Sequence, residues 1–290
     1  MTALTLAGLA IRSVIPRGIW IDEASSIRQA SMPFWAMIQN LYNHDVHPPL
    51  YFSFLWLTIR AAGTTSSTIM RVPSILFGAL AIPVSYAAGR DIWDRRTGVV
   101  AAIFFTVAPL LVWYSQSVRM YSLFMLLALL AAWGQARALR FGRWYDWALF
   151  AVSSAALGWT EYFGLFQVFV QQVVFLGYAW NRRADRQKFQ RLALGWAITD
   201  VFIVTALAPL VPFVIHQFFN NQAVGAGFGT PSVVNLPNKG RVSIYAVVAN
   251  IIWAVWGYQS THTMAVLGAL WPIGVFVAFF LLGRRWRRQA

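Results

Sequence analysis

The sequence contains no cysteine, so it can form no disulfide bond, thiolate nucleophile or cysteine-based metal site. Charged residues are also scarce: they make up 11% of the chain, whereas a soluble domain carries about 25%. Acids are the rarest charged type, with nine aspartate and glutamate residues in total. The shortage of charge excludes an ordinary soluble domain.

Apolar residues are abundant in place of charged ones. They make up 59% of the chain and include 15 tryptophans and 22 phenylalanines. Repeated long apolar runs indicate an all-α, polytopic helical membrane protein. The net charge of +14 could indicate a nucleic-acid partner. The basic residues, however, form short clusters between apolar runs, which is the pattern of cytoplasmic loops. We therefore expect no nucleic-acid partner.

Seven apolar runs are long enough to span a membrane: residues 71–89, 97–114, 121–139, 145–162, 164–180, 192–216 and 264–283. Residues 2–11 resemble the end of an eighth helix, so either the natural N-terminus is longer or this helix is incomplete. Residues 50–59 are too short to span, and residues 243–259 are long enough but carry polar groups. We expect about eight transmembrane helices, with these two segments lying on the membrane surface.

The charge clusters give this arrangement an orientation. With both ambiguous segments on the surface, four basic connections share one side: residues 90–96, 137–143, 182–191 and 284–288. They hold most of the lysines and arginines, so that side is expected to be cytoplasmic. The opposite side collects residues 12–70, a first large loop, residues 115–120 and 160–163, and a second large segment, 217–263. We expect a single domain, 1–290, with its site on the extracytoplasmic face.

Two adjacent acids, Asp22 and Glu23, stand in the stretch IWIDEASS of the first loop. Carboxylates in the first turn of a helix stabilise its exposed N–H groups, so helix capping is one interpretation. On a helix, neighbouring side chains project about 100° apart. The second interpretation is therefore a pocket in which one acid takes a proton and the other holds a hydroxyl.

The segment NHDVHPPLYF brings His44, Asp45 and His47 next to a rigid Pro48-Pro49 turn. Imidazole and carboxylate are good metal ligands, so a divalent metal is possible. One short segment rarely completes a metal site, and we favour the orientation of a polar substrate.

Further candidates lie on the same face. Arg119, in WYSQSVRMYSL, could snorkel to the membrane surface or hold a phosphate. Lys239 and Arg241, in NLPNKGRVS, could anchor the chain at the interface or join the same site. Asp200 lies inside a span near its cytoplasmic end. We interpret it as a partner for a cytoplasmic-side arginine or as a helix-packing hydrogen bond.

The order of these motifs resembles a known family. The Asp-Glu pair, HPPLYF, RVPSILFGALAIPVSYAAGRDIWDRRTG, YSQSVRMYSL and TEYFGLF follow one another over roughly residues 15–180. They resemble the polyprenyl-phosphate-sugar glycosyltransferases of the GT-C fold, in the branch of dolichyl-phosphate-mannose protein mannosyltransferase-like and aminoarabinose transferase-like proteins. The resemblance implies inverting transfer of a sugar from a polyprenyl-phosphate donor to a hydroxyl of an acceptor glycan, lipid or protein, in what we expect to be a bacterial plasma membrane.

The resemblance also implies roles for individual residues. Asp22 would be the base that deprotonates the acceptor, and Glu23 would help to hold acceptor or sugar. Arg119 would face the lipid phosphate. The remaining substrate-binding candidates are His44, Asp45, His47, Tyr121, Glu161, Lys239 and Arg241.

The sequence departs from the family pattern at two of these motifs. Many relatives have Glu where this chain has Ser117, and His where it has Glu161. Relatives also usually carry further helices. Two alternatives to the enzyme therefore stay open: a non-catalytic assembly subunit, and a lipid or sugar transporter. Transporters tend to place polar groups near the membrane midplane, whereas here the spans are nearly free of them, which favours the enzyme.

Overall fold

Helices are the only regular elements in residues 1–14 and 18–220, the part of the chain that the computed structural model describes. In chain order they are α1 (Thr2–Ser13), α2 (Ile21–Ala30), α3 (Phe34–His44), α4 (Leu50–Ala62), α5 (Ser67–Ile92), α6 (Arg95–Val107), α7 (Pro109–Ser115), α8 (Tyr121–Phe141), α9 (Trp144–Thr160), α10 (Gly164–Arg182), α11 (Arg186–Leu207) and α12 (Leu210–Asn220). The prediction of an all-α protein is confirmed.

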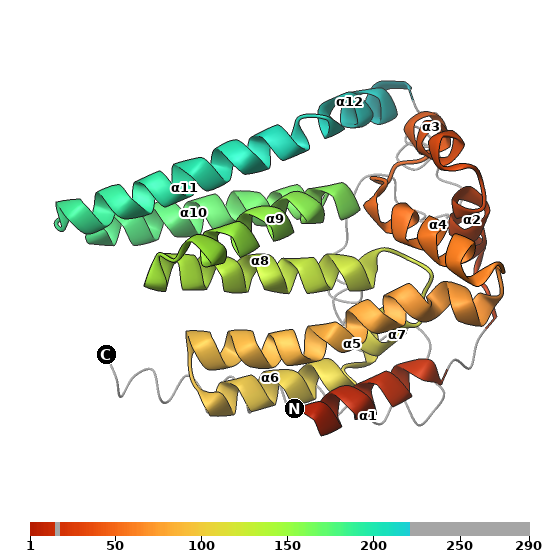
Figure 1. Ribbon diagram of the computed structural model, residues 1–290, viewed down its shortest axis with the longest axis horizontal. Coiled ribbons are helices and arrows are strands. Elements are labelled where there is room, and N and C mark those ends of the chain that lie inside the picture. The colour runs from red at the N-terminus through yellow and green to blue at the C-terminus, as the bar shows by residue number, and fades with distance from the viewer. Residues whose placement is uncertain (15–17, 221–290) are drawn as a thin grey trace, which may run out of the picture.

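The long helices run side by side, and the short helices gather at one end of them (Figure 1). We call this the short-helix end; it consists of α2, α3, α4 and α12. The opposite, basic end carries the α5–α6, α8–α9 and α10–α11 connections. Three of the predicted basic clusters, residues 90–96, 137–143 and 182–191, therefore meet at one end, as the charge pattern predicts. The fourth, residues 284–288, lies outside the described residues.

Three helices are long and apolar enough to cross a membrane: α5, α8 and α11. The bent pair α6 and α7 forms a fourth candidate. The predicted span 264–283 and the predicted surface helix 243–259 lie outside the described residues, so the total of eight stays a prediction. The predicted surface helix 50–59 corresponds to α4, a short apolar helix.

The predicted span 97–114 is bent in the structure, where α6 and α7 meet at an angle of 57°. Pro109 has no N–H to donate to the carbonyl of Phe105 one turn earlier, which breaks the helix. Arg12 of α1 is fully buried against the break. It donates to the carbonyls of Phe105 at 2.6 Å and Thr106 at 3.2 Å, and so satisfies backbone groups that the bend exposes.

The predicted span 192–216 is likewise divided, because α11 ends at Leu207 and α12 starts at Leu210. Pro209 has no N–H to donate to the carbonyl of Thr205 one turn earlier, which accounts for the break. Helix α12 packs on α3 (Figure 1). The ring of His216 stacks on Tyr42 with 4.1 Å between centroids, and His216 Nδ1 lies 3.1 Å from the Tyr42 carbonyl oxygen.

A hydrophobic core lies beneath the short helices and holds them on the bundle. It is formed by Met37, Leu41, Tyr51, Phe52, Leu55, Met70, Val118, Met120 and Leu123, from α3, α4, α5, α8 and the loop before α8. This core fixes the first loop against residues 116–120, and so brings together segments that lie far apart in the sequence.

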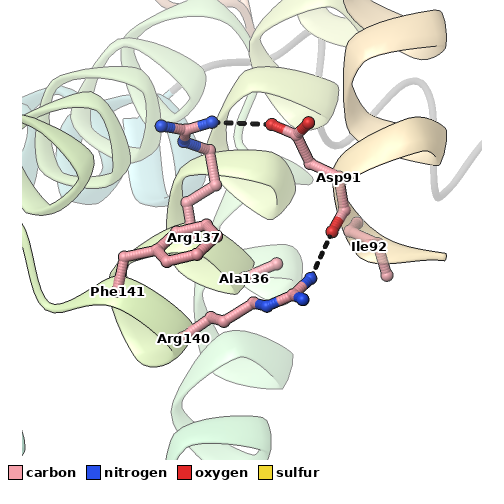
Figure 2. A pocket seen from close by; sticks show the side chains of 6 residues that line it. All are labelled: Asp91, Ile92, Ala136, Arg137, Arg140 and Phe141. Atoms are coloured by element: carbon pink, nitrogen blue, oxygen red, sulfur yellow. Dashed lines mark hydrogen bonds and ion pairs between the residues drawn. The ribbon is translucent and has the colours of Figure 1, made fainter. Parts of the chain in front are cut away.

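Ion pairs close the basic end. Arg137 of α8 lies between Asp91 of α5 and Asp146 of α9, with both N–O distances at 2.6 Å. Figure 2 shows Asp91 and Arg137 beside Arg140 and Phe141, around a cavity of about 100 Å³. These charges join three helices at the end opposite to the short helices.

Candidate active site

Glu23 anchors the start of α2. Its side chain is 2% exposed. One carboxylate oxygen accepts hydrogen bonds from the backbone N–H of Trp20 at 3.0 Å and from the Arg71 guanidinium at 3.1 Å. The other accepts from the backbone N–H of Val118 at 2.9 Å. Glu23 therefore caps its own helix and fixes that helix to α5 and to the loop that carries Arg119.

Asp22 has the opposite environment. Its side chain is exposed, and no residue that the structure describes donates a hydrogen bond to its carboxylate. The capping interpretation thus holds for Glu23, which accepts from the Trp20 N–H. It does not hold for Asp22, whose carboxylate accepts no backbone N–H among the described residues. Glu23 fixes the first turn of α2 to the loop that carries Arg119, and Asp22, the neighbouring residue in that turn, has its side chain exposed.

Asp45 organises the HDVH segment where α3 ends. One oxygen accepts from the N–H groups of Val46 at 2.7 Å and His47 at 3.0 Å, and from His47 Nδ1 at 2.6 Å. The other accepts from Gln29 of α2 at 2.5 Å. Burial raises the pKa of Asp45, but the hydrogen bonds from His47, Gln29 and Val46 outweigh it and hold the pKa below its usual value. Asp45 is therefore ionised at neutral pH.

Arg119 is half-buried in the loop before α8 and contacts His47. One of its terminal nitrogens lies 3.1 Å from His47 Nε2. Its guanidinium lies over the ring of Tyr121, 5.9 Å from the centroid. Arg119 Nε is buried and has no hydrogen-bond partner among the described residues. A buried donor without a partner is costly, so this nitrogen marks a place where a ligand could bind.

Glu161 reaches the same region from the end of α9. Burial raises the pKa of its carboxyl, while the hydrogen bond from the Tyr162 N–H and the charge of Arg119 oppose that shift. The next residue, Tyr162, donates its hydroxyl hydrogen to Gln217 of α12 at 2.6 Å, and burial raises the pKa of Tyr162 as well. Glu161 thus adds a second acid to the group around Arg119.

Not every predicted residue joins this group. His44 is exposed at the end of α3 and makes no hydrogen bond within the described residues. Lys239 and Arg241 lie outside them. No group of three His, Asp or Glu side chains in residues 1–14 and 18–220 could hold a metal ion.

Two residues of the group escaped the sequence analysis. Arg71 is buried against Glu23, and Gln29 joins α2 to Asp45. Arg71 starts one of the motifs on which the family resemblance rests, but an arginine at the start of an apolar run is also typical of a membrane boundary. Nothing in the sequence distinguishes Gln29 from an ordinary helix-surface residue.

Comparison with known proteins agrees with this arrangement. Residues 46–216 match the family described as dolichyl-phosphate-mannose-protein mannosyltransferase. The chain belongs to this family. The matched residues include His47, Arg119 and Glu161, whereas Asp22 and Glu23 precede them.

The fold is that of a GT-C membrane mannosyltransferase. A solved structure of the S. cerevisiae protein O-mannosyltransferase Pmt1–Pmt2 complex, bound to the sugar donor, aligns with a TM-score of 0.60 and 18% sequence identity. The alignment covers 79% of this chain and 35% of the yeast chain, so this chain spans about a third of that mannosyltransferase. Comparison with curated protein sequences gives no match.

Proposed function

We propose that this protein is a glycosyltransferase that moves a sugar from a polyprenyl-phosphate donor to an acceptor hydroxyl, with inversion at the anomeric carbon. The observation that carries the proposal is the contact between the two segments that hold an open carboxylate, Asp22, and a cation, Arg119. Glu23 binds the N–H of Val118, next to Arg119, and so holds the two parts of the site together. Family membership supports a mannosyltransferase-like donor.

The reaction needs little more than these two groups. Asp22 takes the proton of the acceptor hydroxyl as its oxygen attacks the anomeric carbon. The bond from that carbon to the phosphate oxygen breaks, and its electron pair leaves with the prenyl phosphate. Because a phosphate is a good leaving group, no general acid is required. Arg119 stabilises the charge that the departing phosphate gains.

The site would face the extracytoplasmic side, in what we propose is a bacterial plasma membrane. The clusters at the basic end have the composition of cytoplasmic loops, and the short-helix end lies opposite them. The exposed side chains of Trp35 on α3 and Trp20 before α2 suit a position at the lipid–water interface.

This proposal can be tested by a transfer assay in membranes that contain the protein. A polyprenyl phosphate with a radiolabelled mannose, and a second with a labelled aminosugar, are supplied as donors. We expect label to enter an acceptor as free polyprenyl phosphate accumulates, and the product to have the anomeric configuration opposite to that of the donor. Retention of configuration would contradict direct displacement. Absence of transfer from every such donor would favour a non-catalytic subunit.

A further inference from the structure

Asp45, His47 and Arg119 form a hydrogen-bonded chain that the proposed reaction does not by itself explain. We propose that Asp45 and His47 are positioning residues, which aim the Arg119 guanidinium at the donor phosphate and do not touch the sugar. The inference rests on the proposed function for the identity of the phosphate, and it deepens that proposal by assigning the role of the HDVH segment.

The contacts of His47 indicate which nitrogen of its neutral ring carries the proton. Arginine has only donors, so His47 Nε2 must accept the hydrogen bond from Arg119 at 3.1 Å. The proton of the neutral ring then lies on Nδ1, which donates to Asp45 Oδ1 at 2.6 Å. The carboxylate thus selects the tautomer that can accept from Arg119.

This use of both ring nitrogens leaves His47 no polar atom for a substrate. The sequence-based assignment of His47 as a substrate-binding residue would need one free nitrogen. Asp45 is also engaged through both oxygens, since it accepts from Gln29, Val46 and His47. A direct contact with the sugar would have to break one of these bonds.

Arg119, in contrast, keeps donors free. His47 takes one terminal nitrogen, and Nε is buried without a partner among the described residues. Since the guanidinium is planar and rigid, anchoring one nitrogen fixes the direction of the others. Nε and a terminal N–H can then form paired hydrogen bonds to a phosphate, the geometry in which arginine binds this group most strongly.

Asp45 also connects the cation to the base. Gln29 belongs to α2, the helix whose first turn contains Asp22, and donates to Asp45. The same helix is fixed at its other end by Glu23, which binds Val118 beside Arg119. Two independent links therefore set the separation between Asp22 and Arg119, which must match the separation of acceptor hydroxyl and donor phosphate.

Binding to the purified full-length chain in lipid nanodiscs tests this role without requiring transfer. The probes are decaprenyl phosphate and decaprenol, which differ only in the phosphate. The informative variants are His47→Gln, whose side-chain oxygen can replace Nε2 as acceptor for Arg119, and His47→Asn, whose amide can replace only Nδ1. Thermal unfolding of each variant shows that it is folded.

In His47→Asn we expect the preference for the phosphate probe to fall about tenfold, the effect of losing one hydrogen bond to a charged group. In His47→Gln we expect most of the preference to remain. Arg119→Ala should lose the preference, and His47→Asn in that background should add nothing, because His47 acts through Arg119. Asp185→Asn, which replaces an exposed aspartate at the basic end, is the control and should bind both probes like the wild type.

Two results would overturn the inference: a wild-type phosphate preference in His47→Asn, or additive losses in the double variant, which would show that His47 contacts the ligand itself. A failure of the proposed function gives a different result. In that case His47→Asn and Arg119→Ala still lose phosphate binding, while no donor sugar is transferred.

Discussion

Adjacent carboxylates repel each other, and in this chain with few acids the two neighbours Asp22 and Glu23 lie in very different environments. Glu23 is buried among three donors, of which one is the Arg71 guanidinium. Asp22 points to the exterior. The two acids thus differ in role: Glu23 holds the helix in place, and the exposed Asp22 carboxylate is the one that we propose as the base. This division accounts for an acid pair in a chain with so few acids.

Glu23→Gln is expected to destabilise the protein more than Asp22→Asn. Both partners of the Glu23–Arg71 pair are almost fully buried, so the substitution leaves the arginine charge uncompensated. Breaking such a pair costs about 3–5 kcal/mol of unfolding free energy, whereas an exposed substitution changes it by about 0.5 kcal/mol or less. Thermal unfolding in detergent compares the two variants. Equal melting temperatures would contradict the structural role of Glu23.

Glu161 should make stability fall as pH rises just above its usual pKa of about 4.3. Burial raises the pKa of Glu161 in the folded protein, so the folded state holds this proton more tightly than the unfolded state. The free energy of unfolding therefore declines with pH between the usual and the raised pKa. We expect Glu161→Gln to remove this decline in melting temperatures measured from pH 4.5 upward. An unchanged pH profile in the variant would contradict it.

At the scale of the elements, hydropathy predicted where helices lie and failed where they bend. Apolar runs identify α5, α8, α9 and α10 closely, because burial in lipid or protein depends on composition. The same measure joined α6 to α7 and α11 to α12, because it ignores the missing N–H of a proline. Pro109 and Pro209 were the signals that could have divided them.

Of the two interpretations of Asp200, the structure supports a helix-packing hydrogen bond: Gln172 of α10 donates to the Asp200 carboxylate at 3.1 Å.

Arg12 is expected to hold the bend between α6 and α7. Arg12→Met removes the donors to the Phe105 and Thr106 carbonyls, and each buried acceptor left without a partner costs about 1–3 kcal/mol. The melting temperature should drop well below that of Arg28→Met, in which an exposed arginine on α2 is replaced. If the two variants have the same melting temperature, the Arg12 contacts do not stabilise the bend.

At the scale of the molecule, sequence alone predicted which segments share an end, because loop charge and helix length determine the side on which each connection lies. It could not predict which side chains meet there. The contacts of Glu23 with Val118, and of His47 with Arg119, join residues 95 and 72 positions apart. They depend on how the short helices pack on their hydrophobic core, which no local pattern encodes.

The absence of native cysteine makes the predicted orientation directly measurable. Asn43→Cys places a thiol at an exposed position of the short-helix end, and Ala184→Cys places one at the basic end. In intact cells we expect a membrane-impermeant maleimide to label Asn43→Cys, and to label Ala184→Cys only after permeabilisation. Labelling in the reverse order would place the site in the cytoplasm.

The central claim is that the open carboxylate of Asp22 acts as the base, and the transfer rate of Asp22→Asn at saturating donor tests it most directly. Asparagine keeps the shape but takes no proton, and a general base contributes about 10²–10⁴-fold to a rate. Asp185→Asn, an exposed aspartate at the basic end, is the matched control. The account predicts at least a hundredfold loss in Asp22→Asn and none in Asp185→Asn. A wild-type rate of transfer in Asp22→Asn would contradict it.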